Sequence, residues 1–150
     1  MELQDNLMLI FTGFARSASK IAKIQIEVTH QKGKELTMMK EICDEGLKRL
    51  TDSKQSLDKF GELLNDQWEI KRNLTDKITN KEIDSIYKAG MDAGALGGKL
   101  LGAGGGGFML FYVPKYKQEN VKLVLKKKLI VPIQFEYTGS KIIYISHQDN

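Results

Sequence analysis

Apolar residues recur every three or four positions over much of the first two thirds of the chain. This spacing places them on one face of a helix, so it predicts an amphipathic helix over residues 34–52. The same pattern starts again at Leu57 and predicts a second helix that runs to about Leu74. The apolar positions of the two helices are Leu36, Met39, Cys43, Leu47, Leu50, Leu57, Phe60, Leu64 and Trp68.

A third long helix is predicted to begin at "TNKE", Thr79–Glu82, because this segment has the spacing of a capping box. Its apolar face would comprise Ile83, Ile86, Tyr87 and Met91.

Near the start of the chain, the apolar run Leu7–Gly13 predicts a buried strand that is closed by glycine. The residues after it predict a further helix, with Ser17 or Ser19 available as its cap.

The period of the pattern changes in the last third of the chain. Gly107–Val113 predicts a strand, and residues 116–128 predict a helix. Pro132–Ser146 holds two alternating runs joined at Gly139, which is typical of a β-hairpin. The elements together predict an α+β fold. In it a small, mostly antiparallel sheet, built largely from the last third, packs with a cluster of helices.

Composition adds that this is one domain that can bury a single core. The chain has 150 residues, of which 41% are hydrophobic and 28% are charged. No apolar run reaches the roughly 20 residues of a membrane span, and the start lacks the basic residues of a signal peptide. Cys43 is the single cysteine, so an internal disulfide is excluded, and we expect it to be a buried small hydrophobe rather than a reactive thiol. These features predict a cytoplasmic protein with no membrane partner.

The net charge of +4 suits anionic ligands, but the basic residues are spread along the chain. The densest run, Lys126–Lys128, ends a predicted helix, where cations complement the helix dipole. We therefore expect a solvated helix end there rather than a nucleic-acid patch. No RNA-binding aromatic motif or zinc-finger spacing is present, so no nucleic-acid partner is predicted.

Glycine is concentrated in one stretch, which holds eight of the 14 glycines. A P-loop there is excluded, because position 93 is alanine and position 100 is leucine where the motif needs glycine and a hydroxyl. A dinucleotide-binding fingerprint is also excluded, because its glycines lie between a strand and a helix, whereas here a helix precedes them and a strand follows. The eight glycines are Gly94, Gly97, Gly98, Gly102, Gly104, Gly105, Gly106 and Gly107.

Two readings of the glycine stretch remain open. Successive backbone amides can form a concave site, or nest, that binds an anion, and Lys99 would add a positive charge. Alternatively, the glycines allow the chain to pack tightly against a neighbouring helix with no ligand. The glycines alone favour neither reading.

The order of motifs resembles the C-terminal half of the GHMP kinases. The resemblance rests most firmly on "IDSIYKAGMDAGALGGKLLGAGGGGF", residues 83–108, whose glycine block is the third motif of that family. It is extended by "WEIKRNLTDKIT", residues 68–79, and by Thr12, Gly13 and Arg16 near the start. The sugar-1-kinase branch of the family shows these features in the same order, and the likeness runs through nearly all of the chain.

The resemblance implies a ferredoxin-like C-terminal kinase domain and a reaction. That reaction is ATP-dependent phosphorylation of the anomeric hydroxyl of D-glycero-D-manno-heptose 7-phosphate, as part of heptose supply to surface polysaccharide such as lipopolysaccharide or S-layer glycan. The implied cofactors are ATP and Mg²⁺, and the implied partners are the sugar phosphate and an N-terminal kinase domain.

The family carries its ATP-binding loop, magnesium-binding helix and catalytic base in an N-terminal half that these 150 residues do not contain. We therefore expect residues 1–150 to form the C-terminal domain alone, to be inactive by itself, and to hold no catalytic base and no metal ligand. A surface that normally meets the other half would be apolar, so self-association is plausible.

The resemblance assigns substrate or phosphate binding to the glycine block. Arg16 and Ser17 follow the first strand, and the Arg16 fork suits a sugar phosphate, although a surface role fits it equally well. The residues that the resemblance assigns to the block are Gly97, Gly98, Lys99, Gly102, Ala103, Gly104, Gly105, Gly106 and Gly107.

Other notable residues have simpler interpretations. We expect Trp68 in the core rather than stacked on a sugar, and the two histidines at the solvated surface. Lys71 and Arg72 adjoin Trp68 and are expected on a solvated helix face, although a position facing the cleft is open. Asp84 is expected to complement the dipole of the third helix.

Two alternative functions remain. The first is a different sugar 1-kinase domain, such as a fucose-type enzyme, which would not require the 7-phosphate. The second is a stand-alone ligand-binding or interaction module derived from the kinase.

Overall fold

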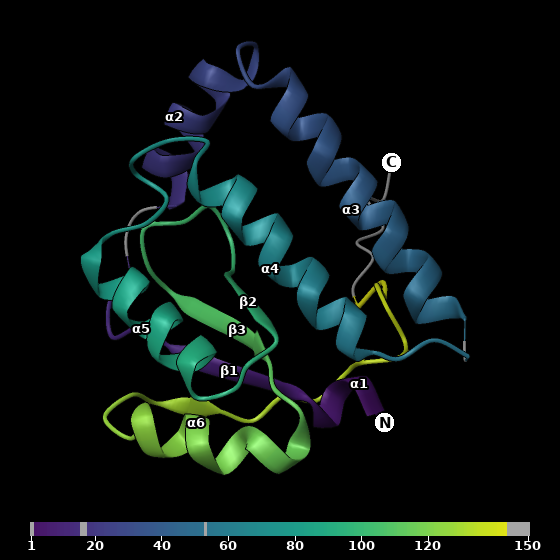
Figure 1. Cartoon of the computed structure of the whole chain (residues 1–150). Helices are drawn as coiled ribbons and strands as arrows, with labels where there is room; N and C mark the ends of the chain where they lie inside the picture. Colours follow the sequence, from purple (N-terminus) through teal and green to yellow (C-terminus); the bar gives the residue numbers. More distant parts are fainter. Residues whose placement is uncertain (1, 16–17, 53, 144–150) are drawn as a thin grey trace, which may run out of the picture.

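The computed structural model describes residues 2–15, 18–52 and 54–143, and Figure 1 shows the arrangement of their helices and strands. In chain order the elements are α1 (Glu2–Asp5), β1 (Leu7–Phe11), α2 (Ala18–Thr29), α3 (Gly33–Thr51), α4 (Asp58–Arg72), α5 (Lys81–Asp92), β2 (Gly97–Leu100), β3 (Phe108–Tyr112), a 3₁₀ turn (Lys115–Lys117), α6 (Gln118–Val124) and β4 (Ile130–Val131).

The four strands form one antiparallel sheet in the order β2-β3-β1-β4. Helices α2 to α5 connect β1 to β2, and α6 connects β3 to β4, which gives the βαββαβ order of a ferredoxin-like fold. In the central pair, Leu7 lies opposite Tyr112 and Phe11 lies opposite Phe108. The predicted α+β class and ferredoxin-like architecture are confirmed.

The core lies on one face of this sheet. Met8 and Ile10 of β1 alternate with half-buried neighbours, as expected for a strand with one covered face. Side chains of α5 and α6 cover the face, and Trp68 of α4 completes the cluster, so the predicted core position of Trp68 is confirmed. The fully buried members of the core include Ile10, Trp68, Ile78, Ile83, Leu100, Met109, Phe111, Val113 and Val121.

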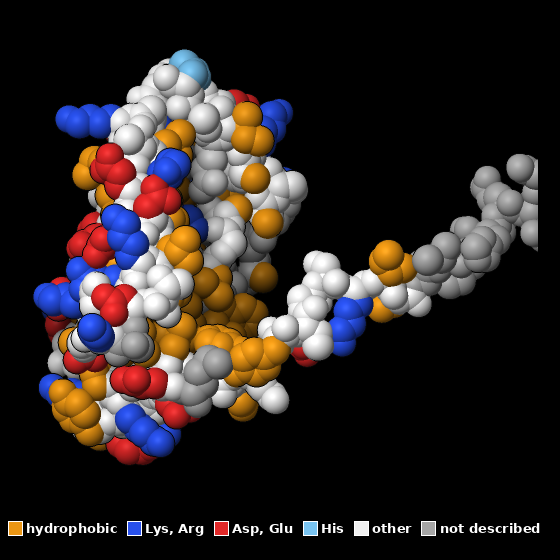
Figure 2. Space-filling view, turned by 90° about the vertical axis from the view of Figure 1, so that its right-hand side faces the viewer, with side chains coloured by type: hydrophobic (Ala, Val, Ile, Leu, Met, Phe, Trp, Pro, Cys, Tyr) orange, Lys and Arg blue, Asp and Glu red, His pale blue; other side chains and the backbone are white. Residues whose placement is uncertain are grey.

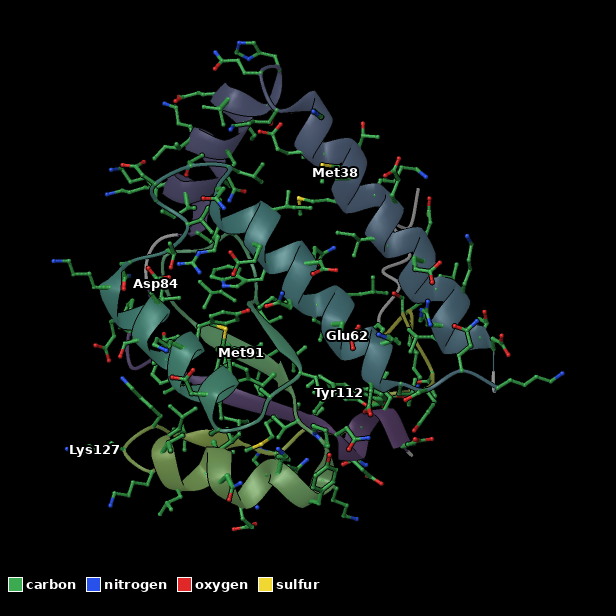
Figure 3. The ribbon with its side chains drawn as sticks, in the orientation of Figure 1. Met38, Glu62, Asp84, Met91, Tyr112 and Lys127 are labelled. Carbon is green, nitrogen blue, oxygen red and sulfur yellow. The ribbon has the colours of Figure 1, made fainter. Side chains whose placement is uncertain are left out.

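Glycines bring α4 and α5 unusually close to the sheet. A Cβ atom on Gly97 would lie 1.8 Å from the carbonyl oxygen of Gly61, so α4 contacts β2 backbone to backbone. A Cβ atom on Gly90 or Gly98 would lie 2.5 Å from the ring of Phe111. Tyr112 lies beside the first turn of α4 (Figure 3), where its hydroxyl donates to Asp58 at 3.3 Å.

The predicted helices are confirmed, with two corrections. Helix α5 begins within the predicted segment Thr79–Glu82, but its N-cap is Asn80, whose side chain accepts from the amides of Glu82 and Ile83, one residue later than the capping-box spacing implies. The predicted helix over residues 116–128 is shorter, because α6 ends at Val124.

The expectation for the sheet needs a larger correction. β1 and β2 lie outside the last third of the chain, and β2 lies inside the glycine stretch, where no strand is predicted. The predicted hairpin is wrong over residues 132–143, which contain no strand, and the rest of it falls outside the described residues. Figure 2 shows the end of this segment leaving the body of the molecule, where Tyr137, Ile142 and Ile143 are exposed, whereas Ile133 and Phe135 nearer the body are half-buried.

Helix α3 packs against α4 on one side only. The structure shows Cys43 exposed, so the prediction of a buried cysteine is wrong. The apolar stripe is only partly covered, and Leu47 remains 63% exposed. Between α3 and α4 lies an open groove of about 290 Å³, lined by Ile42, Cys43, Gly46, Leu47, Leu50, Phe60, Leu63, Leu64 and Gln67.

Within the described parts of the chain, no helix combines the length and the apolar character needed to cross a membrane.

Candidate functional site

The glycine block forms the loop that joins β2 to β3, residues 101–107, which we call the glycine loop. The Leu101 amide donates to the Phe108 carbonyl oxygen at 2.8 Å and closes the loop at its base. The strand β2 precedes the loop, so the predicted order of helix, glycines and strand is wrong. A dinucleotide-binding fingerprint needs a helix directly after its glycines, whereas here a strand follows the loop, so that fingerprint is still excluded.

The far end of the glycine loop is fastened to the residues after β1. The Gly107 amide donates to the Phe14 carbonyl oxygen at 2.9 Å and lies 3.1 Å from the Thr12 hydroxyl oxygen. The Thr12 amide in turn donates to the Gly107 carbonyl oxygen at 2.9 Å. Thr12 is fully buried, so these bonds are shielded from water. Its role was not predicted, although Thr12 is one of the residues that carry the family resemblance.

The middle of the glycine loop packs against the segment before α5. The Gly105 amide donates to the Ile78 carbonyl oxygen at 2.8 Å. A Cβ atom on Gly104 would lie 2.9 Å from the Ile78 Cα atom, and one on Gly106 would lie 2.8 Å from the Phe14 carbonyl oxygen. Both glycines have positive φ, at 113° and 155°, so side chains are excluded here on two grounds.

Two side chains donate hydrogen bonds to carbonyl groups in the first half of the glycine loop and at Leu100 just before it. The Lys71 Nζ atom of α4 donates to the Leu100 carbonyl oxygen at 3.2 Å and to the Gly102 carbonyl oxygen at 2.5 Å. The Gln25 Nε2 atom of α2 donates to the Ala103 carbonyl oxygen at 2.7 Å. These carbonyl groups therefore point toward the body of the protein. Sequence reasoning missed Gln25, because nothing in its spacing marks it.

Four amides of the glycine loop have no acceptor among the residues that the structure describes: those of Gly102, Ala103, Gly104 and Gly106. A loop whose carbonyl groups face protein donors, and whose amides are left open, has the polarity of an anion-binding nest. The glycines of the stretch therefore divide into two groups. Gly97 and Gly98 lie in β2 and allow close packing, whereas the loop from Gly102 carries the open amides.

Lys99 lies beside the glycine loop on β2. Its Nζ atom is hydrogen-bonded to the Gln67 Oε1 atom of α4, and the Gln67 amide nitrogen lies 3.2 Å from the Cys43 sulfur. Burial lowers the pKa of Lys99 below its usual range. Burial and the nearby charge of Lys99 lower the pKa of Lys71 from 10.5 to about 8.

Arg72 joins the end of α4 to the start of α5. Its guanidinium lies 2.5 Å from the Asp84 carboxylate and 5.8 Å from the centre of the Trp68 ring. The same carboxylate also accepts a hydrogen bond from the Thr79 hydroxyl at 2.6 Å. Figure 3 shows Asp84 on the first turn of α5, where a carboxylate also complements the helix dipole, as predicted. Lys71 and Arg72 are both half-buried and bonded, so the expectation of a solvated helix face is wrong for them.

The remaining predicted residues lie apart from this site. Arg16, Ser17 and His147 lie outside the described residues, and His30 is exposed as predicted. Lys126 and Lys127 are exposed, and Lys127 points away from the body (Figure 3). The prediction of a solvated helix end is wrong for Lys128, because its side chain is half-buried and its ammonium lies 2.6 Å from the Glu82 carboxylate.

The described residues do not fit a magnesium site. They contain no group of three or more acidic, histidine or cysteine side chains that could hold a metal ion. Mg²⁺ binds carboxylate oxygens and phosphate, and the groups around the glycine loop are amides and lysines. These groups fit the phosphate of a ligand instead.

The class of domain is defined by a ferredoxin-like sheet in which the hairpin of β2 and β3 carries a glycine loop with open amides. The chain belongs to the GHMP kinase family, since the family description "GHMP kinases C terminal" matches residues 38–131, more than half of the chain. Kinases of this family use ATP and Mg²⁺.

Two full-length relatives are similar to this chain in sequence. It is 33% identical over 147 residues to D-glycero-alpha-D-manno-heptose 7-phosphate kinase from Campylobacter jejuni, covering 91% of this chain and 40% of the relative. It is 27% identical over 118 residues to the bifunctional fucokinase/GDP-fucose pyrophosphorylase of Arabidopsis thaliana, covering 73% of this chain and 10% of that protein. The chain thus spans less than half the length of either relative.

Solved mevalonate kinases share the fold. The enzyme of Methanococcus jannaschii aligns with a TM-score of 0.71 at 23% identity, covering 87% of this chain and 40% of that one. The L. major enzyme, solved in complex with R-mevalonate, aligns with a TM-score of 0.69 at 23% identity, covering 81% of this chain and 37% of that one.

Proposed function

We propose that this chain is the C-terminal domain of a sugar kinase that phosphorylates the anomeric hydroxyl of D-glycero-D-manno-heptose 7-phosphate with ATP. The similarity over 91% of the chain to a heptose 7-phosphate kinase supports this substrate. The product would be the 1,7-bisphosphate, an intermediate suited to nucleotide-sugar synthesis for surface polysaccharide in the cytoplasm.

One observation carries the proposed role of the glycine loop: its carbonyl groups at Gly102 and Ala103, like that of Leu100 just before it, face protein donors, while four of its amides lack an acceptor among the described residues. Phosphoryl transfer depends mainly on positioning and on electrostatic stabilisation of the transferred group. Preformed amides meet both needs, because they are already oriented when the phosphate arrives.

The other parts of the reaction belong to a second domain. The described residues near the glycine loop hold no carboxylate cluster for Mg²⁺, and none of them is assigned as the base. We infer that an N-terminal kinase domain supplies both and completes the ATP site. This chain alone would bind a phosphorylated ligand weakly and would not turn over.

The test is ADP release with magnesium-ATP and heptose 7-phosphate, measured for this chain alone and after addition of the N-terminal half of the Campylobacter jejuni relative. Turnover only in the mixture would support the proposal. Turnover by this chain alone would contradict the proposal. The two halves of the relative, mixed together, serve as the positive control. If that control releases ADP and the mixture with this chain does not, the proposal is also contradicted.

A second candidate is a fucose-type 1-kinase domain, which the similarity to a bifunctional fucokinase favours. The two candidate functions are distinguished by measuring ADP release from the same mixture with an unphosphorylated sugar as the substrate. Equal turnover with fucose and with heptose 7-phosphate would favour the second candidate.

A further inference from the structure

An apolar stripe runs along helix α3, and the described residues leave it partly uncovered. Its members recur at intervals of three, four, four and three residues, which is the average spacing of a coiled-coil seam. The leucines among them are all exposed, and Leu47 is 63% exposed. The members of the stripe are Leu36, Met39, Cys43, Leu47 and Leu50.

Helix α4 runs beside α3 in the opposite direction and forms the other wall of the open groove (Figure 1). Its groove residues Phe60, Leu64 and Gln67 recur at intervals of four and three, as those of α3 do. Antiparallel helices with apolar seams of this period pack in pairs as four-helix bundles. The pair of α3 and α4 therefore has the pattern of half a bundle, and the open groove is the seam that a second pair of helices would cover.

The face formed by these two helices is large enough for a reversible interface. Helices of 19 and 15 residues are about 28 and 22 Å long, and two packed helices form a strip about 20 Å wide. Such a strip has an area of about 500 Å², so two of them bury about 1,000 Å² in all. Specific interfaces between proteins begin at about this size, and those at the low end are transient.

The charges on this face allow a second copy of the chain to approach. Helix α3 has four acidic and four basic residues, and α4 has four acidic and three basic residues, so together they are nearly neutral. The whole chain carries +4, so its positive charge lies mainly on other elements. Several charges of the face are already paired, such as Lys40 with Asp44 at 2.6 Å. Repulsion between two such faces is therefore small.

We propose that the α3–α4 face, meaning the groove and the stripe along α3, binds the same face of a second copy of this chain. A two-fold axis relates the copies, so each contact between the faces occurs twice. The two α3 helices run antiparallel, and Leu47 and Leu50 of each copy pack into the seam of the other. The result is a four-helix bundle that extends the packing of α3 on α4.

A second copy fits the groove better than the C-terminal segment of the same chain. Ile142 and Ile143 of that segment are also exposed, but Figure 2 shows them extending away from the body. The segment contains no helix over residues 132–143, whereas the spacing of the groove residues is that of helix packing.

The test is the oligomeric state of the full 150-residue chain, measured by sedimentation velocity between about 1 µM and about 1 mM. We expect a monomer–dimer equilibrium. Leu47→Glu should raise the dimer dissociation constant about a hundredfold, because each dimer loses two buried leucine side chains. Leu123→Glu is the matched control, since Leu123 of α6 is 67% exposed and lies outside the groove. This variant should dimerise as the unsubstituted chain does.

The single cysteine shows whether the copies meet at this face. Cys43 lines the groove and is the neighbour of Ile42, the midpoint of α3. In a two-fold antiparallel arrangement the midpoints of the two α3 helices lie near the axis, so the two Cys43 side chains are close together. A short bismaleimide should therefore join two chains, and Leu47→Glu should lose most of this product. A dimer that the reagent does not join would overturn the proposal.

Three further results would overturn it. The first is a chain that stays monomeric over the whole concentration range; if Leu47→Glu then weakens binding of the N-terminal half of the Campylobacter jejuni relative, the groove belongs to that domain. The second is an equal rise of the dissociation constant in Leu47→Glu and Leu123→Glu. The third is loss of the dimer in a chain that ends at Thr138, which would assign the contact to the C-terminal segment.

Circular dichroism of each variant establishes that it is folded before its oligomeric state is measured. The measurements need no substrate, so their outcome is independent of the turnover test of the kinase.

Discussion

One segment of this chain has the sequence pattern of a β-hairpin and forms none among the described residues, whereas another forms a hairpin that its sequence did not predict. Residues 97–112 fold as β2, the glycine loop and β3. Residues 132–143 alternate apolar and polar side chains and have a glycine at the expected turn, yet they contain no strand.

The difference lies in what covers the apolar side chains. In the formed hairpin, Leu100, Met109 and Phe111 are fully buried beneath the helices. In the C-terminal segment, Ile142 and Ile143 are 81% and 94% exposed, and Figure 2 shows the segment extending away from the body. Alternation specifies which side chains share a face, but a two-stranded hairpin becomes stable only when another layer covers that face.

The largest expected effect comes from a glycine in the formed hairpin. In Gly97→Ala the new Cβ atom would lie 1.8 Å from the Gly61 carbonyl oxygen, so α4 must move off β2. We expect a loss of about 3 kcal/mol or more in the free energy of unfolding, measured by urea denaturation.

Gly139→Ala is the matched control for that substitution. Gly139 has a φ of 63°, but no atom lies within 4 Å of its added Cβ atom. Its effect on the urea midpoint should be within error, because the segment around it is not packed. A cost in Gly139→Ala equal to that in Gly97→Ala would contradict the contrast between the two segments.

A smaller effect is expected at the point where the glycine loop is fastened to the residues after β1. Thr12→Ala removes a buried hydroxyl that lies 3.1 Å from the Gly107 amide, and should cost about 1–3 kcal/mol. Thr12→Ser keeps the hydroxyl and should recover most of that loss. Equal destabilisation in both variants would assign the effect to the lost methyl group instead.

The lysines at the glycine loop predict a dependence of stability on pH. The pKa of Lys71 is about 8 in the folded chain and 10.5 in the unfolded chain, so the unfolded chain binds more protons between these values. The free energy of unfolding should therefore rise from pH 8 toward pH 10. Tyr87 and Tyr112 oppose this above pH 10, because their pKa values are raised to about 12 in the fold.

Urea denaturation at several pH values checks this dependence. The rise between pH 8 and pH 10 should be smaller in Lys71→Met than in the unsubstituted chain. An identical rise in both would show that Lys71 does not titrate in this window.

The smallest effect is expected from removal of the C-terminal segment. A chain that ends at Thr138 loses the exposed isoleucines but keeps the bond from the Phe135 amide to Gln4, at 2.8 Å. The free energy of unfolding should change by less than about 0.5 kcal/mol. A larger loss would mean that the segment packs on the body in solution.

Sequence reasoning predicted the helices well, because their apolar faces repeat over many residues. α3, α4 and α5 begin and end within about two residues of the expected positions. β2 was missed because two of its four residues are glycines, which ordinarily disfavour strands. Gly97 and Gly98 are tolerated there because α4 and the Phe111 ring occupy the space that side chains would need.

The candidate site was predictable in part. The density of glycine marked the loop, and the family resemblance gave it a function to test. The residues that hold the loop could not be found in this way. Gln25, Lys71 and Ile78 are distant from it in sequence, and only the fold brings their polar groups to it.

The most direct test of the account compares the amides within the glycine loop. When inorganic phosphate is titrated into the ¹⁵N-labelled chain, the signals of Gly102, Ala103 and Gly104, whose amides lack an acceptor among the described residues, should shift and saturate. The signals of Gly105 and Gly107, which already donate to Ile78 and Phe14, should move little. Uniform shifts across all five residues, or none at all, would contradict the claim that the glycine loop presents a preformed phosphate site.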